Sequence, residues 1–487
     1  MATATKQTKS TFISALLRKK NVVTEEENHG LKRCLSAFDL SLMGVGAIIG
    51  TGIFVLTGVA AATTSGPAVV LSFIVAGFAC AFAALAYAEL ASSVGGAGSA
   101  YGYSYAAFGE FIAWIIGWDL ILEYGVATAA VANGWSGYFN NALHGIGLGL
   151  PVALTKGPFA VDPITGLADG GIVNLPAFMI VFLLMMMLII GVKESAKLNT
   201  AMVFIKLLTI IVFLSVALFH INPENWTPFA PFGWFSYNEA GKPIGILAGA
   251  SVVFFAYVGF DAVSTATEEA NKPQRDIPIG ILSSLIFCTI IYIVVSGTLT
   301  GIVSYKELNV SSPVAFGLQR IGVNWASALV ATGVITGLTT VMLVLYYALT
   351  RILTAMSRDG LLSPLFSHIN KKTQTPVKNT VICGVVMAVM AGFIPLNALA
   401  ELVNVGTLAA FVLVCGGVIV LRKTHPDLPR PFKAPGGILL PVLGIISCGA
   451  LIAFLPLHTH IRFVLWLAVG LVIYFAYGIR KSQLRKQ

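Results

Sequence analysis

The chain has 487 residues, of which 57% are hydrophobic and 10% are charged, and its formal net charge is +9. Its mean hydropathy is +0.86, whereas soluble globular domains carry about 25% charged residues. These values exclude an ordinary soluble protein.

About twelve apolar runs follow one another along the chain, most of them close to the roughly 20 residues that a helix needs to cross a bilayer. The runs cover 38–61, 67–92, 102–131, 172–192, 196–219, 244–268, 279–303, 323–355, 376–393, 397–421, 438–456 and 460–480. Strands of a membrane barrel would instead appear as alternating segments of about 10 residues. The sequence therefore predicts an all-α polytopic membrane protein with about 12 transmembrane helices.

The basic residues are distributed unevenly. Most of the 30 Lys and Arg residues lie in alternate connections and near the two ends of the chain. Because basic loops stay on the cytoplasmic side, both termini are expected in the cytoplasm of a multi-pass protein of the inner (plasma) membrane. The positive charge is thus explained by orientation, and no nucleic acid is expected as a partner.

Two of the runs contain residues that interrupt a helix. The first has four glycines within nine residues, at 44, 46, 50 and 52, and each costs a helix about 1 kcal/mol relative to alanine. The sixth has Gly259 close to a carboxylate, Asp261. Two broken helices five spans apart are typical of an inverted repeat with a binding site at the bilayer midplane. The alternative is that the glycines only allow close helix packing.

This pattern predicts the organisation of the chain. The expected parts are a cytoplasmic segment 1–37, a first repeat 38–219, an extracellular loop 220–243, a second repeat 244–421, a loop with the last two spans 422–480, and a cytoplasmic tail 481–487.

Unwound backbone at these breaks needs hydrogen-bond partners, and a zwitterion supplies them. The N–H groups of Gly50, Thr51 and Gly52, at the N-terminal end of the inner half-helix, suit a carboxylate because they are unsatisfied and lie at the positive end of the helix dipole. Carbonyl groups left free near Ile48, Phe255 and Val258 suit an ammonium. The predicted substrate site comprises Ile48, Ile49, Gly50, Thr51, Gly52, Phe255, Ala256 and Val258.

Three stretches carry a resemblance that covers nearly the whole chain: the glycine-rich first run, the YVGFD sequence 257–261 and the RILTAMSRDGLL sequence 351–362. Together they resemble the amino acid-polyamine-organocation superfamily, and within it the bacterial branch of the cationic amino acid transporter family. The resemblance implies a twelve-helix fold with a five-plus-five inverted repeat, the LeuT-like fold, and alternating access. It also implies that Phe255 is the aromatic gate over the substrate.

Lys206 lies in the middle of the fifth run with no acidic residue nearby in the sequence. The resemblance implies that this lysine sits where sodium-driven relatives hold their ion. Burial disfavours the charged form of a lysine, so Lys206 is the predicted proton-coupling residue. The alternative is a lysine that bridges helices or reaches the membrane surface without titrating.

Acidic residues inside the runs are few, and each is costly unless it is paired, hydrated or neutralised. Glu123 and Asp261 are candidates for a proton relay or for holding a cationic side chain, and Asp119 lies one turn before Glu123. Glu89 and Glu401 are interpreted as structural or gate residues. Thr339 and Thr340 leave sodium coupling open as an alternative.

The predicted function is secondary active transport of small neutral amino acids such as alanine, by proton symport. Uptake of cationic amino acids, amino acid exchange and sodium symport are the alternatives. No catalytic residue, metal site, cofactor or nucleotide-binding motif is expected. The expected partners are the amino acid, protons and the lipid bilayer; the chain is expected to act as a monomer, with an accessory membrane subunit left open.

Overall fold

The computed structural model describes residues 18–19, 35–94, 100–161, 168–190, 196–370 and 375–485. The predicted N-terminal segment 1–37 therefore lies almost wholly outside the described residues. Those that are described form helices, apart from short connections and a two-stranded ribbon of β1 (Ser236–Tyr237) and β2 (Pro243–Ile244).

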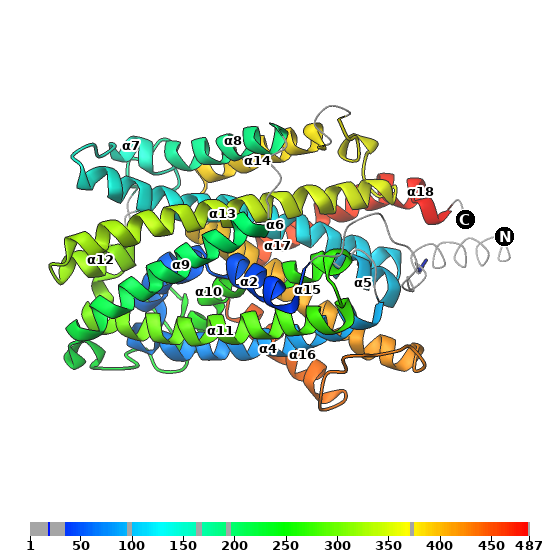
Figure 1. The fold of residues 1–487 in the computed structure, drawn as a ribbon, viewed down its shortest axis with the longest axis horizontal. Coiled ribbons are helices and arrows are strands. Elements are labelled where there is room, and N and C mark those ends of the chain that lie inside the picture. Colours follow the sequence, from blue (N-terminus) through cyan, green and yellow to red (C-terminus); the bar gives the residue numbers. More distant parts are fainter. Residues whose placement is uncertain are drawn as a thin grey trace.

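The long helices lie side by side along the longest axis of the molecule (Figure 1). They are α4 (Val69–Val94), α6 (Glu110–Gly145), α9 (Ala196–Ala217), α11 (Pro273–Ile302), α13 (Asn324–Arg358) and α15 (Leu396–Thr424). Shorter apolar helices are α2 (Ala37–Ile48), α8 (Leu175–Ile190), α10 (Ile246–Val253), α14 (Val377–Phe393), α16 (Leu439–Ala453) and α17 (Leu457–Ile473). The remaining short helices are α3 (Thr57–Ala60), α5 (Ala100–Ala107), α7 (Val152–Thr155), α12 (Pro313–Arg320) and α18 (Ile479–Lys481).

Within the described residues, eight helices are long and apolar enough to cross a membrane, and four shorter apolar helices accompany them. Numbered in chain order, the spans are α2 with the segments to Ser65, α4, α6, α8, α9, α10 with the segments to Glu269, α11, α13, α14, α15, α16 and α17. The prediction of an all-α polytopic membrane protein is confirmed.

The predicted bounds of the third span were wrong at both ends. The expected run 102–131 joins two helices, because Gly109 has a φ of 95° and ends α5 before α6 begins at Glu110. This left-handed conformation is accessible chiefly to glycine. The helix then continues past residue 131 to Gly145, because polar residues there, such as Asn133 and Ser136, form hydrogen bonds with Ala391 and Asn174.

The first four spans each pack against the span that lies five positions later in the chain. The third span, α6, lies against the eighth, α13, and the second, α4, lies against the seventh, α11. The first and sixth spans are adjacent and are both broken. This pairing agrees with the five-plus-five inverted repeat.

Candidate functional site

The breaks of spans one and six lie against each other. In span one, α2 ends at Ile48, and Ile49 is extended with ψ of 99° before a π-helical segment begins at Gly52. A Cβ added to Gly52 would lie 2.2 Å from Ala256 Cα in span six. Such a distance is impossible for a side-chain atom, so glycine at position 52 allows the two unwound segments to touch.

Span six is broken at Val258 and Gly259. Gly259 has a φ of 112°, and a Cβ there would also approach the carbonyl oxygen of Ala47 to 3.2 Å. Both features favour glycine. The helix on either side of this break has the tighter 3₁₀ geometry, over Phe254–Tyr257 and Phe260–Glu269.

A small cavity of about 20 Å³ lies beside the two breaks. Its lining residues are Ala47, Ile48, Gly50, Thr51, Gly52, Ala127, Val131, Phe255, Val258, Val341 and Leu345. Most of the predicted substrate site is among them, but Ile49 and Ala256 are not, because Ile49 is fully buried elsewhere and Ala256 packs on Gly52. Thr51 is the polar residue of this lining, and the side chains of the other lining residues are apolar.

The carboxylate-binding end of the predicted site is formed by Gly50, Thr51 and Gly52. N–H groups in the first turn of a helix have no partner within it, and this end also carries the positive end of the helix dipole. The Thr51 hydroxyl is buried and has no hydrogen-bond partner among the described residues. Gly134 of α6 makes room for it, since a Cβ there would lie 2.6 Å from Thr51 Cγ2.

One detail of the predicted carboxylate site was wrong. Span one consists of two half-helices: α2 comes first in the chain, and the half-helix that begins at Gly52 follows it. With a cytoplasmic N-terminus, this half-helix is the outer one, and α2 is the inner one.

Two of the three carbonyl groups expected to be free, those of Ile48 and Phe255, have partners. The Tyr292 hydroxyl of α11 lies 2.9 Å from the carbonyl oxygen of Ile48 and 2.8 Å from that of Ala256, and can donate to either. The Phe255 carbonyl accepts the N–H of Val258 at 3.3 Å. Because a carbonyl oxygen has two lone pairs, Ile48 and Phe255 each keep one acceptor position for an ammonium.

Lys206 is buried and joins three spans. Its ammonium donates to the carbonyl oxygen of Gly46 in span one at 2.6 Å. Its aliphatic stem packs against Gly337 in span eight, where a Cβ would lie 2.7 Å from Lys206 Cγ. Lys206 does not line the cavity, so any coupling would act through the backbone of span one.

The predicted acidic residues lie together but outside the cavity lining. Glu123 interacts electrostatically with Asp261 and with Asp119, and Asp261 accepts a hydrogen bond from the Tyr124 hydroxyl at 2.9 Å. Neither oxygen of Glu123 or of Asp119 has a hydrogen-bond partner among the described residues. Glu123 and Asp119 therefore lack hydrogen bonds from the described residues, although the Thr407 hydroxyl interacts with Glu123, whereas Asp261 has the Tyr124 hydroxyl as a partner.

The two threonines considered for sodium make internal hydrogen bonds. The Thr339 hydroxyl donates to the Ile335 carbonyl at 2.8 Å and accepts from Trp135 Nε1 at 3.0 Å. The Thr340 hydroxyl donates to the Gly337 carbonyl at 2.7 Å.

Sequence reasoning missed Tyr292 and the cavity residues of spans three and eight. These residues are Ala127, Val131, Tyr292, Val341 and Leu345. Each sits in an apolar helix whose facing side cannot be assigned from a uniformly apolar sequence. The glycine motif revealed the breaks, but no local signal marked the residues opposite them.

Comparisons with known proteins agree with this geometry. The sequence matches the family described as "Amino acid permease" over residues 35–476. It is 48% identical to a branched-chain amino acid permease of Bacillus subtilis (strain 168), over 97% of this chain and 99% of the relative. It is 47% identical to a methylthioribose transporter of the same organism, over 97% of this chain and all of the relative. A vacuolar cationic amino acid transporter of Arabidopsis thaliana is 38% identical over 85% of this chain and 68% of its own length.

Proposed function

The chain belongs to the amino acid permease family, and we propose that it carries neutral aliphatic amino acids, with branched side chains included, across the plasma membrane together with protons. The observation that carries this proposal is the cavity at the paired breaks. It combines a backbone site for a zwitterion with walls made of aliphatic and aromatic side chains.

The walls favour a neutral side chain. Val131, Val341 and Leu345 line the cavity with Phe255 and offer only apolar surface. Burying an aliphatic side chain against such walls is favourable by about 0.8 kcal/mol per CH₂ group, whereas a buried charge without a partner is costly. Once the half-helices part to admit a substrate, leucine, isoleucine and valine would gain more from this surface than alanine, so the proposed substrate range extends from alanine to these larger residues.

Cationic substrates are less well supported. Glu123 and Asp261, the acidic residues that could pair with a basic side chain, do not line the cavity. The branched-chain amino acid permease of Bacillus subtilis is 48% identical, whereas the vacuolar cationic amino acid transporter of Arabidopsis thaliana is 38% identical and a second branched-chain permease, of Lactococcus lactis, is 34% identical.

Proton coupling is supported by two groups of buried residues. The Lys206 ammonium already donates to the Gly46 carbonyl, so a sodium ion at this place would compete with it, and Thr339 and Thr340 are engaged in hydrogen bonds of their own. Glu123 and Asp261 are buried with oxygens that have no partner. We assign Lys206 to coupling through span one, and Glu123 with Asp261 to carrying the proton.

The cycle follows from the arrangement of the breaks. The substrate carboxylate binds the N–H groups at Gly50 to Gly52, its ammonium binds the remaining lone pairs of the Ile48, Phe255 and Val258 carbonyls, and Phe255 closes the site. The two half-helices of spans one and six then open to one side of the membrane at a time. Both chain termini face the cytoplasm in this proposal, and the chain acts as a monomer.

The substrate proposal is tested with purified protein in proteoliposomes. Uptake of labelled leucine is measured with an inward proton gradient and no sodium, and alanine, valine, arginine and methylthioribose are added as competitors. We expect valine and alanine to compete and arginine not to compete. Competition by arginine would replace the proposal with cationic transport, and competition by methylthioribose alone would replace it with transport of a thiosugar. Uptake that occurs only into preloaded vesicles would indicate exchange.

A further inference from the structure

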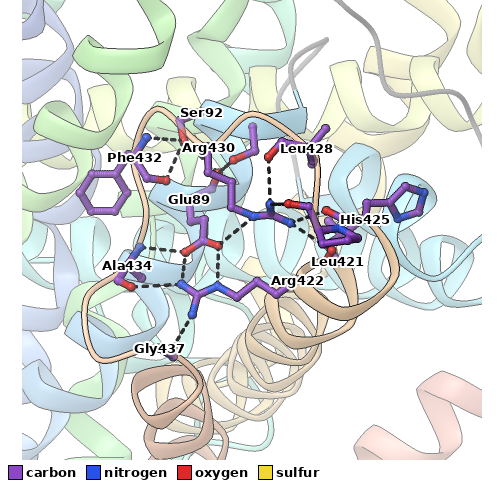
Figure 2. A network of polar contacts seen from close by, with 12 residues as sticks. Glu89, Ser92, Leu421, Arg422, His425, Leu428, Arg430, Phe432, Ala434 and Gly437 are labelled. Carbon is purple, nitrogen blue, oxygen red and sulfur yellow. Dashed lines mark hydrogen bonds and ion pairs between the residues drawn. The ribbon is translucent and has the colours of Figure 1, made fainter.

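Glu89, near the C-terminal end of α4, is the centre of a buried polar network (Figure 2). Its side chain is only 2% exposed. The carboxylate accepts hydrogen bonds from Arg422 Nε at 2.8 Å, from Arg422 Nη2 at 2.5 Å and from the Ala434 N–H at 2.8 Å. Such a two-point arginine bond fixes geometry as well as charge, so Glu89 holds α4 to the end of α15.

Arg430 adds a second positive charge to the network and caps α15. Its Nε lies 3.6 Å from Glu89 Oε1. Its other nitrogens donate to the carbonyl oxygens of Leu421, His425 and Leu428, at 3.0, 2.8 and 2.9 Å. The last carbonyls of a helix have no partner within it, so Arg430 completes the end of α15 and binds the following segment to it (Figure 2).

The segment after α15 is also tied to α4 directly. The Ser92 hydroxyl donates to the Phe432 carbonyl at 3.2 Å and accepts the Phe432 N–H at 3.3 Å. Arg422 donates in addition to the carbonyl of Ala434 at 3.0 Å and to that of Gly437. The segment 425–437, the end of α15 and the end of α4 are thus one connected unit, which we call the Glu89 clamp.

An aromatic cluster leads from the clamp to the break in span six. Tyr87, two residues before Glu89, has its ring 5.8 Å from Phe260 and 5.6 Å from Phe411. The Phe411 ring of α15 lies 5.8 Å from Phe254 and 5.0 Å from Phe260. Phe254 and Phe260 flank the break on its two sides, so the position of α15 relative to α4 determines how Phe411 supports the unwound segment.

A hydrogen bond attaches α15 to span six from the other side of Phe411. Asn404 Nδ2 donates to the carbonyl oxygens of Ser251 and Val252, at 2.7 and 3.3 Å. By contrast, α15 meets α6 at Gly406, where a Cβ would touch Leu122 at 3.0 Å. The hydrogen bonds of α15 described here therefore connect it to spans two and six. Its contact with span three at Gly406 is nonpolar, because glycine has no side chain there.

We propose that Glu89 is a positioning residue for transport: through the clamp it keeps α15 fixed to span two, so that Phe411 supports both sides of the break in span six as the site changes its access. This inference rests on the proposed function. Glu89 does not line the cavity, so its loss should slow the conformational change and leave substrate binding intact.

The test separates binding from turnover in Glu89→Gln. The matched control is Glu110→Gln, because Glu110 is also fully buried and accepts hydrogen bonds from Tyr474 at 3.1 Å and Ser482 at 2.5 Å, but belongs to span three. Leucine Kd and uptake Vmax are measured per folded protein. We expect Glu89→Gln to lower Vmax about tenfold or more, as small misplacements can, with Kd changed less than about twofold, and Glu110→Gln to change neither. Unchanged Vmax, or equal losses in Kd and Vmax, would overturn the inference.

Two further measurements keep the test decisive. If Glu89→Gln does not fold, Arg422→Lys keeps the charge but loses the two-point bond, and a normal Vmax in this variant would overturn the inference. If the wild-type protein proves not to bind leucine, the proposed function fails, and the clamp is tested by the distance between spin labels at positions 93, at the end of α4, and 423, at the end of α15. We expect a narrow distribution in the wild type and in Glu110→Gln, and a broad one in Glu89→Gln; an unchanged distribution in Glu89→Gln would overturn the clamp itself.

Discussion

Glu89 and Glu123 are both buried glutamates in apolar spans, with exposed fractions of 2% and 1%, but their surroundings are opposite. Glu89 accepts hydrogen bonds from Arg422 and Ala434 and lies within 3.6 Å of Arg430. Neither oxygen of Glu123 has a hydrogen-bond partner among the described residues.

The comparison assigns different roles to the two glutamates: Glu89 stabilises the fold, and Glu123 is proposed to take part in transport. A buried charge with arginine partners holds helices in place, and removing it leaves those partners uncompensated. A buried carboxylate without partners contributes nothing to the fold that an uncharged group could not. Its presence is explained if it binds something mobile, and in the proposed function that is a proton.

Glu89→Ala is expected to have the largest effect on stability. Arg422 and Arg430 would remain buried without their carboxylate, which costs about 3–5 kcal/mol. The measurement is the free energy of unfolding of the purified protein in detergent, or the loss of folded protein if unfolding is irreversible. A loss below about 1 kcal/mol would remove the distinction between the two glutamates.

Glu123→Gln is expected to affect coupling rather than stability. The amide cannot carry a transported proton, and no hydrogen bond of Glu123 is lost, so the unfolding free energy should change by less than about 1 kcal/mol. Leucine accumulation driven by a proton gradient should disappear, while exchange of leucine across the membrane continues. Retained accumulation would show that the proton is carried elsewhere, and Asp261→Asn would then be the next variant.

Lys206→Ala should also abolish the dependence of uptake on the proton gradient, but at some cost in stability. It removes the bond to the Gly46 carbonyl, and a buried unsatisfied carbonyl costs about 1–3 kcal/mol. Uptake is measured at several external pH values in proteoliposomes. A pH dependence equal to that of the wild type would leave Lys206 as a structural bridge, comparable to the arginines of the Glu89 clamp.

Thr51→Val is expected to have the smallest effect on the fold. The two side chains have similar shapes, and the Thr51 hydroxyl has no partner in the described residues. A hydrogen bond to the charged substrate carboxylate is worth about 1.5–3 kcal/mol, so Kd should rise about tenfold or more for every amino acid alike. Selective loss for one side chain would place Thr51 beside the side chain instead of the carboxylate.

The sequence allowed the spans, the two breaks and much of the cavity lining to be predicted, because each depends on local composition. Gly50, Gly52 and Gly259 are visible as helix-breaking residues, and the structure places Gly52 in contact with span six. The third span was misplaced because one glycine, Gly109, divides an apolar run that otherwise looks continuous.

Contacts between distant spans could not be predicted. Glu89 and Arg422 are 333 positions apart, and Tyr292 reaches the Ile48 carbonyl from 244 positions away. In helices that are apolar on every side, periodicity does not reveal which face meets which neighbour. The cavity walls formed by Val131, Val341 and Leu345 therefore became visible only once the packing was known.

The most direct test of the central claim is whether leucine moves protons. Proteoliposomes with a pH-sensitive dye inside are given external leucine, with no pH gradient, no sodium and the membrane potential clamped by potassium and valinomycin. The account predicts acidification of the interior that depends on the leucine concentration and is absent in Glu123→Gln. Leucine uptake without acidification would contradict proton symport.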